Sequence, residues 1–281
     1  MCSSDLTFIS EDQLDSATRR HARQNPCELE FIKQWALVPQ PPWLHYLFKP
    51  EEEKGLGLQC PVVMVHGNHE GFDHLSCLAG ERVPPHAVGV EELPGVDPGR
   101  YIRLLPSGWR ALLPSGHVIA GVGGIQSGQR KTQYHPMAYI DDAHILGLLP
   151  YADEIDILLT HQGPEMFQGD GGSDSFNLFV EKRVGKAWFH GHSVRDPEIK
   201  SMGRKPQVVP LKDVAFIMHG ERMYDPGKEG WAFIELSEEI SIVRETPPFW
   251  RDFRFYRWFA QEDGTLVAPP LAPFASRSKE T

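Results

Sequence analysis

Side chains that could bind a metal follow directly on short apolar runs at three places in the sequence. Asn68 and His69 come after PVVMV, and His161 comes after IDILLT. His190 and His192 flank a glycine directly after KAWF. Imidazole nitrogen and amide oxygen are ligands for zinc, iron, manganese or nickel. Any one of these histidines alone would more often be structural, but the three groups together predict a metal site.

The apolar runs have the length and composition of buried β-strands. We expect strands at residues 61–65, 101–105, 117–122, 155–160 and 186–189. Open α/β sheets bind ligands at the carboxyl ends of their strands, where the following loops leave room for a metal and a substrate. On an extended backbone, alternate side chains share one face, so both histidines of the third group could reach one metal cluster.

The remaining segments predict one domain and a tail. Residues 11–36 are polar and then read EFIKQWAL, which fits an amphipathic helix. Ser173 or Ser175 is expected to cap a second helix that runs to about Val184. Short β-like segments follow: VVPL, VAFIMHG, GWAFIEL and ISIV. Residues 263–281 are rich in proline, alanine, serine and charge, which predicts a disordered tail. The domain is therefore expected to occupy residues 1–262.

Composition excludes several classes of protein. The chain has 281 residues and a formal net charge of −10, which argues against sequence-independent binding of nucleic acid. An acidic protein that acts on an anionic substrate needs local positive charge, which metal ions supply. None of the four cysteines forms a CxxC pair, so a structural zinc knuckle is not expected. The start MCSSDLTFIS lacks the pattern of a signal peptide and no stretch is long enough to cross a bilayer, so we expect a cytoplasmic location without a membrane partner.

Three further patterns fail as functional motifs. GVGGIQSG has Gln126 where the dinucleotide-binding fingerprint requires glycine. Gly191-His192-Ser193-Val194-Arg195 lacks the last glycine of a nucleophile elbow, which argues against a serine hydrolase. The aromatic run at 247–259 is better explained by packing on the core than by stacking on bases, given the acidic overall charge.

Four segments resemble, in order, the motif blocks of the calcineurin-like metallophosphoesterase superfamily. They are VVMVHGNHE (62–70), VIAGVGGI (118–125), DILLTHQGP (156–164) and WFHGHS (188–193), and the resemblance covers about residues 1–245. The resemblance implies an α/β fold of the four-layer α/β/β/α sandwich type. In that fold two mixed sheets pack face to face and helices flank them on the outside.

The resemblance also implies an activity and a role for each motif residue. Asn68 and His161 would bind metal, and one or both of His190 and His192 would complete the cluster. His69 would stabilise the scissile phosphate or protonate the leaving oxygen without binding the metal. The metals would be divalent manganese, iron or zinc, two in a complete family member. A metal-activated hydroxide would hydrolyse a phosphomonoester or a phosphodiester.

Two further assignments depend on the same resemblance. In CSSDLTFISEDQL (2–14), Ser4-Asp5 stands where the family has Gly-Asp, so Asp5 would be the carboxylate that bridges the metals. The basic pair Arg130 and Lys131 in GVGGIQSGQRKTQYHP resembles the lariat-debranching branch and would bind substrate.

The sequence departs from the family pattern in two places. No D-x-H block precedes GNHE, so the domain is expected to lack the family's first strand. The GHxH block has two possible registers. Aligned on Gly191-His192, its last histidine is replaced by Val194; aligned on the H-x-H spacing, His190 and His192 are both retained.

These departures leave two rival hypotheses beside the hydrolase. One is a catalytically impaired relative that binds metal or phosphate without turnover, which turnover assays with added manganese would distinguish. The other is a scaffold protein whose histidines are structural, which metal analysis of the purified chain would distinguish.

Overall fold

The computed structural model places a defined subset of the chain. It describes residues 61–68, 70, 72–80, 82–96, 100–127, 135–168, 171–192, 198–201, 206–211, 218–219, 222–223, 231–236, 240–245, 259–260 and 266–267. The predicted helix within 11–36 lies outside these residues. None of the described helices is long and apolar enough to span a bilayer.

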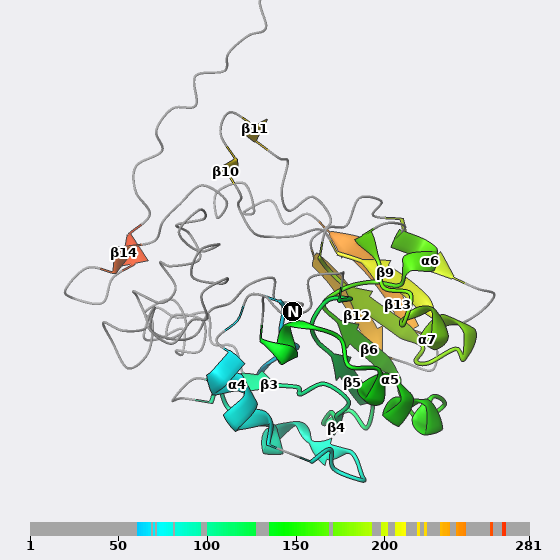
Figure 1. The fold of residues 1–281 in the computed structure, drawn as a ribbon, viewed down its shortest axis with the longest axis horizontal. Helices are drawn as coiled ribbons and strands as arrows, with labels where there is room; N and C mark the ends of the chain where they lie inside the picture. Colours follow the sequence, from blue (N-terminus) through cyan, green and yellow to red (C-terminus); the bar gives the residue numbers. More distant parts are fainter. Residues whose placement is uncertain are drawn as a thin grey trace, which may run out of the picture.

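A seven-stranded mixed sheet forms the centre of the fold, in the order β2-β4-β5-β6-β7-β9-β8 (Figure 1). Its strands are β2 (Val88–Gly89), β4 (Arg110–Leu112), β5 (Val118–Val122), β6 (Ile157–Thr160), β7 (Ala187–His190), β8 (Lys200–Ser201) and β9 (Gln207–Pro210). Strands β5, β6, β7 and β9 run parallel to one another. They are almost continuously apolar, as expected for strands that are covered on both faces.

Helices cover one face of this sheet. Every second residue of the central strands, including Ala120, Leu158 and Trp188, packs into a cluster with Ile145 and Phe179. Ile145 belongs to α5 (Asp142–Leu148) and Phe179 to α7 (Asn177–Glu181). Figure 1 shows both helices beside β5 and β6. Among the described residues, this is the largest of the three clusters of buried hydrophobic residues.

A second layer of strands covers the opposite face. Ile119, Ile157 and Phe189 of the central sheet pack in a cluster that includes Val65 and reaches Ile234. Val65 directly follows β1 (Val62–Met64), which pairs in parallel with β3 (Ile102–Leu104). Ile234 belongs to β12 (Trp231–Leu236), which pairs in antiparallel fashion with β13 (Ile240–Glu245). The two β layers are therefore face to face.

Helix α4 (Phe72–Ala79) completes the fourth layer. Met64 of β1 and Leu104 of β3 point away from the central sheet and pack with Leu75 of α4. The order of layers is thus helices, central sheet, second strand layer and helix. The expected α/β architecture, a mixed sheet with flanking helices, is confirmed.

The remaining elements are short. They are η3 (Val90–Glu92), η4 (Pro136–Ala138), η5 (Leu149–Tyr151), α6 (Glu165–Gln168), the pair β10 (Met218–His219) and β11 (Arg222–Met223), and the pair β14 (Phe259–Ala260) and β15 (Leu266–Val267). Strand β15 lies within the stretch expected to be a disordered tail. The domain boundaries stay a prediction.

The strands agree with the apolar runs, but the helix cap was wrongly predicted. Helix α7 begins after Phe176, which makes no side-chain cap hydrogen bond. Ser173 instead pairs with the chain beside it: its N–H donates to Gly163 O (2.8 Å) and its carbonyl accepts from Glu165 N (2.9 Å). A residue held in this bridge cannot serve as the cap of a helix that starts four positions later.

Candidate metal centre

The ends of β6 and β7 meet at the carboxyl edge of the central sheet. Thr160 of β6 lies opposite His190 of β7. His161 is the next residue after β6, and its carbonyl accepts a hydrogen bond from Gly191 N (3.0 Å). This bond extends the pairing by one residue past the strands. It therefore places the side chain of His161 beside the turn that leaves β7.

Asn68 reaches the same place from the second strand layer. Nε2 of His161 donates a hydrogen bond to Oδ1 of Asn68 over 2.9 Å, and both side chains are buried. The ring of His192 lies 4.7 Å from the ring of His161, centroid to centroid, at an interplanar angle of 49°. The structure thus brings Asn68, His161 and His192 together between the two β layers.

The spacing of these groups fits a metal ion. Two donors that each lie about 2.1 Å from an ion, at right angles to one another, are about 3 Å apart. The separation between Asn68 Oδ1 and His161 Nε2 matches neighbouring positions on one ion. To offer the Nε2 lone pair, His161 needs only to move its proton to Nδ1, without a change in net charge.

The described residues alone provide a partial donor set. Among them, no group of three or more histidine, cysteine, aspartate or glutamate side chains could hold a metal. Two imidazoles and one amide oxygen could serve as part of the ligand set of one transition-metal ion, and its remaining ligands would come from outside the described residues or from water. Their role as ligands stays a prediction.

His190 has a different environment from His192. It is the last residue of β7, it is buried, and its ring packs edge-on against Trp188, with centroids 6.4 Å apart. Its Nδ1 donates to Gly191 O over 3.3 Å. Burial lowers the pKa of His190 to about 4, although this hydrogen bond opposes the shift. The ring is therefore neutral at pH 7 and lies on the helix-covered face of the sheet.

The expected extended geometry of the H-x-H pair is wrong. Strand β7 ends at His190, and His192 has a φ of 55°, in the left-handed region. Side chains alternate between two faces only while the backbone stays extended. The left-handed turn, which costs about 1–3 kcal/mol for a residue other than glycine, directs the His192 ring to His161. Such strain is common at functional sites.

A second buried histidine supports the loop that carries Asn68. Nδ1 of His66 donates to Gly67 O (3.0 Å), and Nε2 accepts from Ser107 Oγ (3.1 Å). Burial lowers the pKa of His66 to about 4; nearby His144 and His135 act in the same direction. The next backbone amide, Gly67 N, donates to Glu70 Oε1 over 3.0 Å. The backbone before Asn68 is therefore held on both sides by side chains.

Two glutamines connect the loops that follow β5 and β6. Oε1 of Gln162 accepts from Gln126 N (2.7 Å), and its Nε2 donates to Gly171 O (2.8 Å). Gln126 Oε1 in turn accepts from Asp174 N (2.7 Å). The loop that begins at His161 is thus tied to two other loop segments through amide side chains.

Four of the predicted site residues cannot be placed. Asp5, His69, Arg130 and Lys131 lie outside the described residues, so their roles stay predictions.

The sequence interpretation also missed three residues, His66, Ser107 and Gln162. His66 and Gln162 stand next to motif residues, so their positions were a usable signal. Ser107, in a loop between β3 and β4, had no such signal.

Comparison with known proteins gives one family. The family model of calcineurin-like phosphoesterases matches residues 25–196, which is more than half of the chain. The matched span includes every described residue of the candidate site. A comparison with curated proteins finds no match.

Proposed function

The chain belongs to the calcineurin-like phosphoesterase family, and on this premise we propose that it hydrolyses a phosphomonoester or phosphodiester with a divalent manganese, iron or zinc ion. Membership supports metal-dependent phosphoester hydrolysis in general. The observation that carries the proposal is the 2.9 Å contact between Asn68 and His161, with His192 beside it. Three metal-binding side chains meet here from strand ends that are far apart in the sequence.

Asn68, His161 and His192 would hold the ion with neutral oxygen and nitrogen donors. A divalent cation supplies Lewis-acid charge and makes water a better nucleophile near neutral pH. Because these three donors carry no negative charge, they leave the charge of the cation available to an anionic phosphoester. That charge matters in a protein whose own net charge is −10.

The proposal includes four residues whose roles depend on the sequence alone. His69 follows Asn68 directly and would protonate the leaving oxygen or stabilise the scissile phosphate. Asp5 would add a carboxylate ligand, and Arg130 with Lys131 would bind the phosphoester. A cytoplasmic location belongs to the same proposal and is tested by cell fractionation.

Turnover and metal content test the proposal together. The purified full chain is incubated with Mn²⁺, Zn²⁺ or Fe²⁺, and the hydrolysis of p-nitrophenyl phosphate and of bis(p-nitrophenyl) phosphate is measured. We expect metal-dependent turnover that His161→Ala abolishes. The control is His117→Ala, which changes a histidine on the turn before β5 and should retain full activity. Absence of both bound metal and turnover would reject the proposal.

A second candidate function is binding of metal or phosphate without turnover. One observation favours it: when the GHxH block is aligned on Gly191-His192, Val194 stands in place of the family's last histidine. The same assay separates the two functions. Metal bound in stoichiometric amount, without hydrolysis of either ester, would identify the binding protein.

A further inference from the structure

The loop that carries Asn68 is joined to two other strand ends through His66. The His66 carbonyl accepts from Gly124 N (3.3 Å), just past the end of β5. Its ring Nε2 contacts Ser107 Oγ (3.1 Å), in the loop after β3. The same oxygen of Ser107 accepts from Gly123 N (2.9 Å). Ser107 therefore links the ring of His66 to the glycine turn that follows β5.

The direction of each hydrogen bond follows from the chemistry of the groups. A carbonyl oxygen only accepts, so the bond to Gly67 O places the single ring proton of neutral His66 on Nδ1. Nε2 then accepts, and the hydroxyl of Ser107 must donate to it. The backbone amide of Gly123 donates to the hydroxyl oxygen. Removing that hydroxyl would take a partner from a buried ring nitrogen and from a backbone amide at once, which is costly.

Packing confines the same ring. A Cβ atom on Gly123 would lie 2.4 Å from Cε1 of His66, so the ring fills the space that a side chain at position 123 would need. Phe72 closes another side, with its ring edge-on to His66 at 6.1 Å between centroids. Gly123 and Phe72 therefore confine two sides of the ring, and the hydrogen bond from Ser107 sets its orientation.

We propose that Ser107 is a positioning residue that holds Asn68 in place for metal binding by fixing the ring of His66. This inference rests on the proposed function, because it assigns Asn68 to the metal. Ser107 would act on the metal site through His66, which its hydroxyl contacts, and not as a ligand. Its hydroxyl fixes the ring, the ring fixes the backbone of Gly67, and Asn68 Oδ1 is thereby kept 2.9 Å from His161 Nε2. Loss of such a supporting group typically weakens metal affinity about 10–100-fold.

The test is the dissociation constant for Mn²⁺ of the full chain, measured by calorimetry at a temperature where every variant is folded. Ser107→Ala should raise it about 10–100-fold. Ser107→Thr keeps the hydroxyl and should restore most of the affinity. The matched control is Ser115→Ala, which removes another serine–histidine bond (3.0 Å to His117 Nδ1) from an exposed turn and should leave affinity unchanged.

Gly123→Ala is a second variant that should disturb the loop that carries Asn68. It keeps the Ser107 hydroxyl but forces the His66 ring to move, so it should weaken Mn²⁺ binding in the same way. Circular dichroism on each variant confirms that the fold is retained. Agreement between the two variants would support a positional effect, because they share no chemical change.

The possible outcomes separate this inference from the proposed function. If the unaltered chain binds none of Mn²⁺, Zn²⁺ and Fe²⁺, both are wrong. A chain that binds Zn²⁺ or Fe²⁺ but not Mn²⁺ is titrated with that ion instead. If the unaltered chain binds the titrated ion and Ser107→Ala binds it equally well, the proposed function stands and the positioning role is rejected. A Ser107→Thr variant as weak as Ser107→Ala would also reject the role, because the hydroxyl would then not be the cause.

Discussion

The buried histidines at the carboxyl end of the central sheet and the charged groups near the start of β6 find their partners in different ways. At the carboxyl end, the rings of His66 and His161 are bonded to a hydroxyl, a carbonyl and an amide. Around the start of β6, by contrast, charged groups pair with one another, as Asp156 does with Lys186. Paired charges stabilise a structure, but they cancel one another and attract a charged ligand only weakly. Neutral donors that converge leave the charge of a cation uncompensated, which is what a site for an anionic substrate requires.

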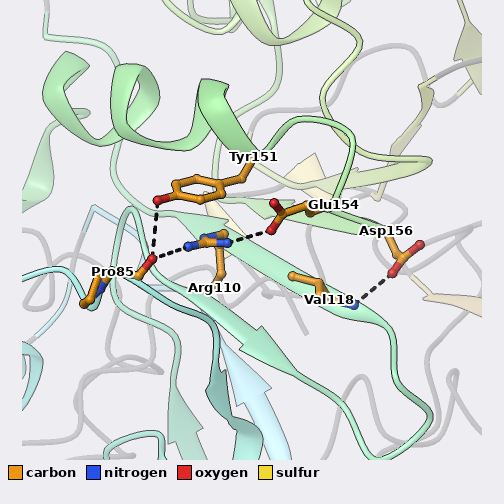
Figure 2. Close-up of polar contacts among 6 residues, drawn as sticks. All are labelled: Pro85, Arg110, Val118, Tyr151, Glu154 and Asp156. Carbon is orange, nitrogen blue, oxygen red and sulfur yellow. Dashed lines mark hydrogen bonds and ion pairs between the residues drawn. The ribbon is translucent and has the colours of Figure 1, made fainter.

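Figure 2 shows how the charged groups near β6 are balanced. Arg110 of β4 donates to Glu154 Oε2 (3.1 Å) and to Pro85 O (2.8 Å), while its guanidinium lies 3.3 Å from the centre of the Tyr151 ring. Arg110 is 6% exposed, so these contacts replace most of its hydration. The cluster joins β4 to the segment that enters β6, and its role is structural.

The largest effect is expected from His69→Ala, next to the proposed ligand Asn68 in the sequence. If His69 acts on the scissile phosphate without binding the metal, kcat should fall about 10²–10⁴-fold. Metal content should stay the same. Initial rates with p-nitrophenyl phosphate, together with elemental analysis, measure both quantities. Joint loss of metal and activity would make His69 a ligand, and unchanged activity would remove it from the mechanism.

The next largest effects distinguish the roles of His192 and His190, in metal binding and in stability respectively. His192→Gln should raise the dissociation constant for Mn²⁺ by about 100-fold or more, because the ion loses a donor beside His161. His190→Gln should instead lower the free energy of unfolding by about 1–3 kcal/mol, because a buried ring that packs on Trp188 is lost. Calorimetric titration and thermal unfolding of both variants provide the comparison.

The results also decide the register of the third motif. Equal loss of metal in both variants would support the H-x-H register. Loss in His192→Gln alone would support the GHxH register, with Val194 in place of a histidine. No loss in either would make the motif structural.

Arg110→Met tests the charged cluster and should affect stability but not metal binding. We expect the free energy of unfolding to fall by about 2 kcal/mol, from lost hydrogen bonds and the lost contact with Tyr151. Glu154→Gln is the control and should cost less than about 1 kcal/mol, because Glu154 is exposed and its ion pair is hydrated. Urea unfolding measures both. Weaker Mn²⁺ binding in Arg110→Met would show that the two ends of the sheet are coupled.

The smallest expected effect is the contribution of Asp156 to the pH dependence of folding stability. Burial raises its pKa, but hydrogen bonds from Lys186 and from Val118 N (2.9 Å) outweigh burial, and the net pKa is lowered. A carboxyl whose pKa is lowered by folding stabilises the fold above its unfolded pKa of about 3.9 and loses that contribution as pH falls through the folded value.

Asp156→Asn should therefore be less stable than the unaltered chain by about 1 kcal/mol at pH 7. The difference should begin to shrink below about pH 4 and should disappear once the pH is below the lowered pKa of folded Asp156, where both side chains are neutral. Urea unfolding at pH 7 and at pH 3 compares them. A difference that does not change with pH would mean that Asp156 contributes by hydrogen bonding alone.

Local pattern determined most of the strands and the family. The apolar runs that became β1, β5, β6 and β7 are recognisable because a buried strand must be apolar over its whole length. Asn68, His161 and His192 could be proposed as a group because each follows such a run. The calcineurin-like fold was likewise readable from four short blocks in order.

Tertiary structure decided which of these residues meet. His190 and His192 are two positions apart, yet only the left-handed turn at His192 sends its ring to His161. Ser107 reaches His66 across 41 residues, and no local pattern marks it. Short-range sequence patterns report which backbone conformation and which face a residue prefers. The partner of a buried polar side chain depends on how distant segments pack, and only the folded chain determines that.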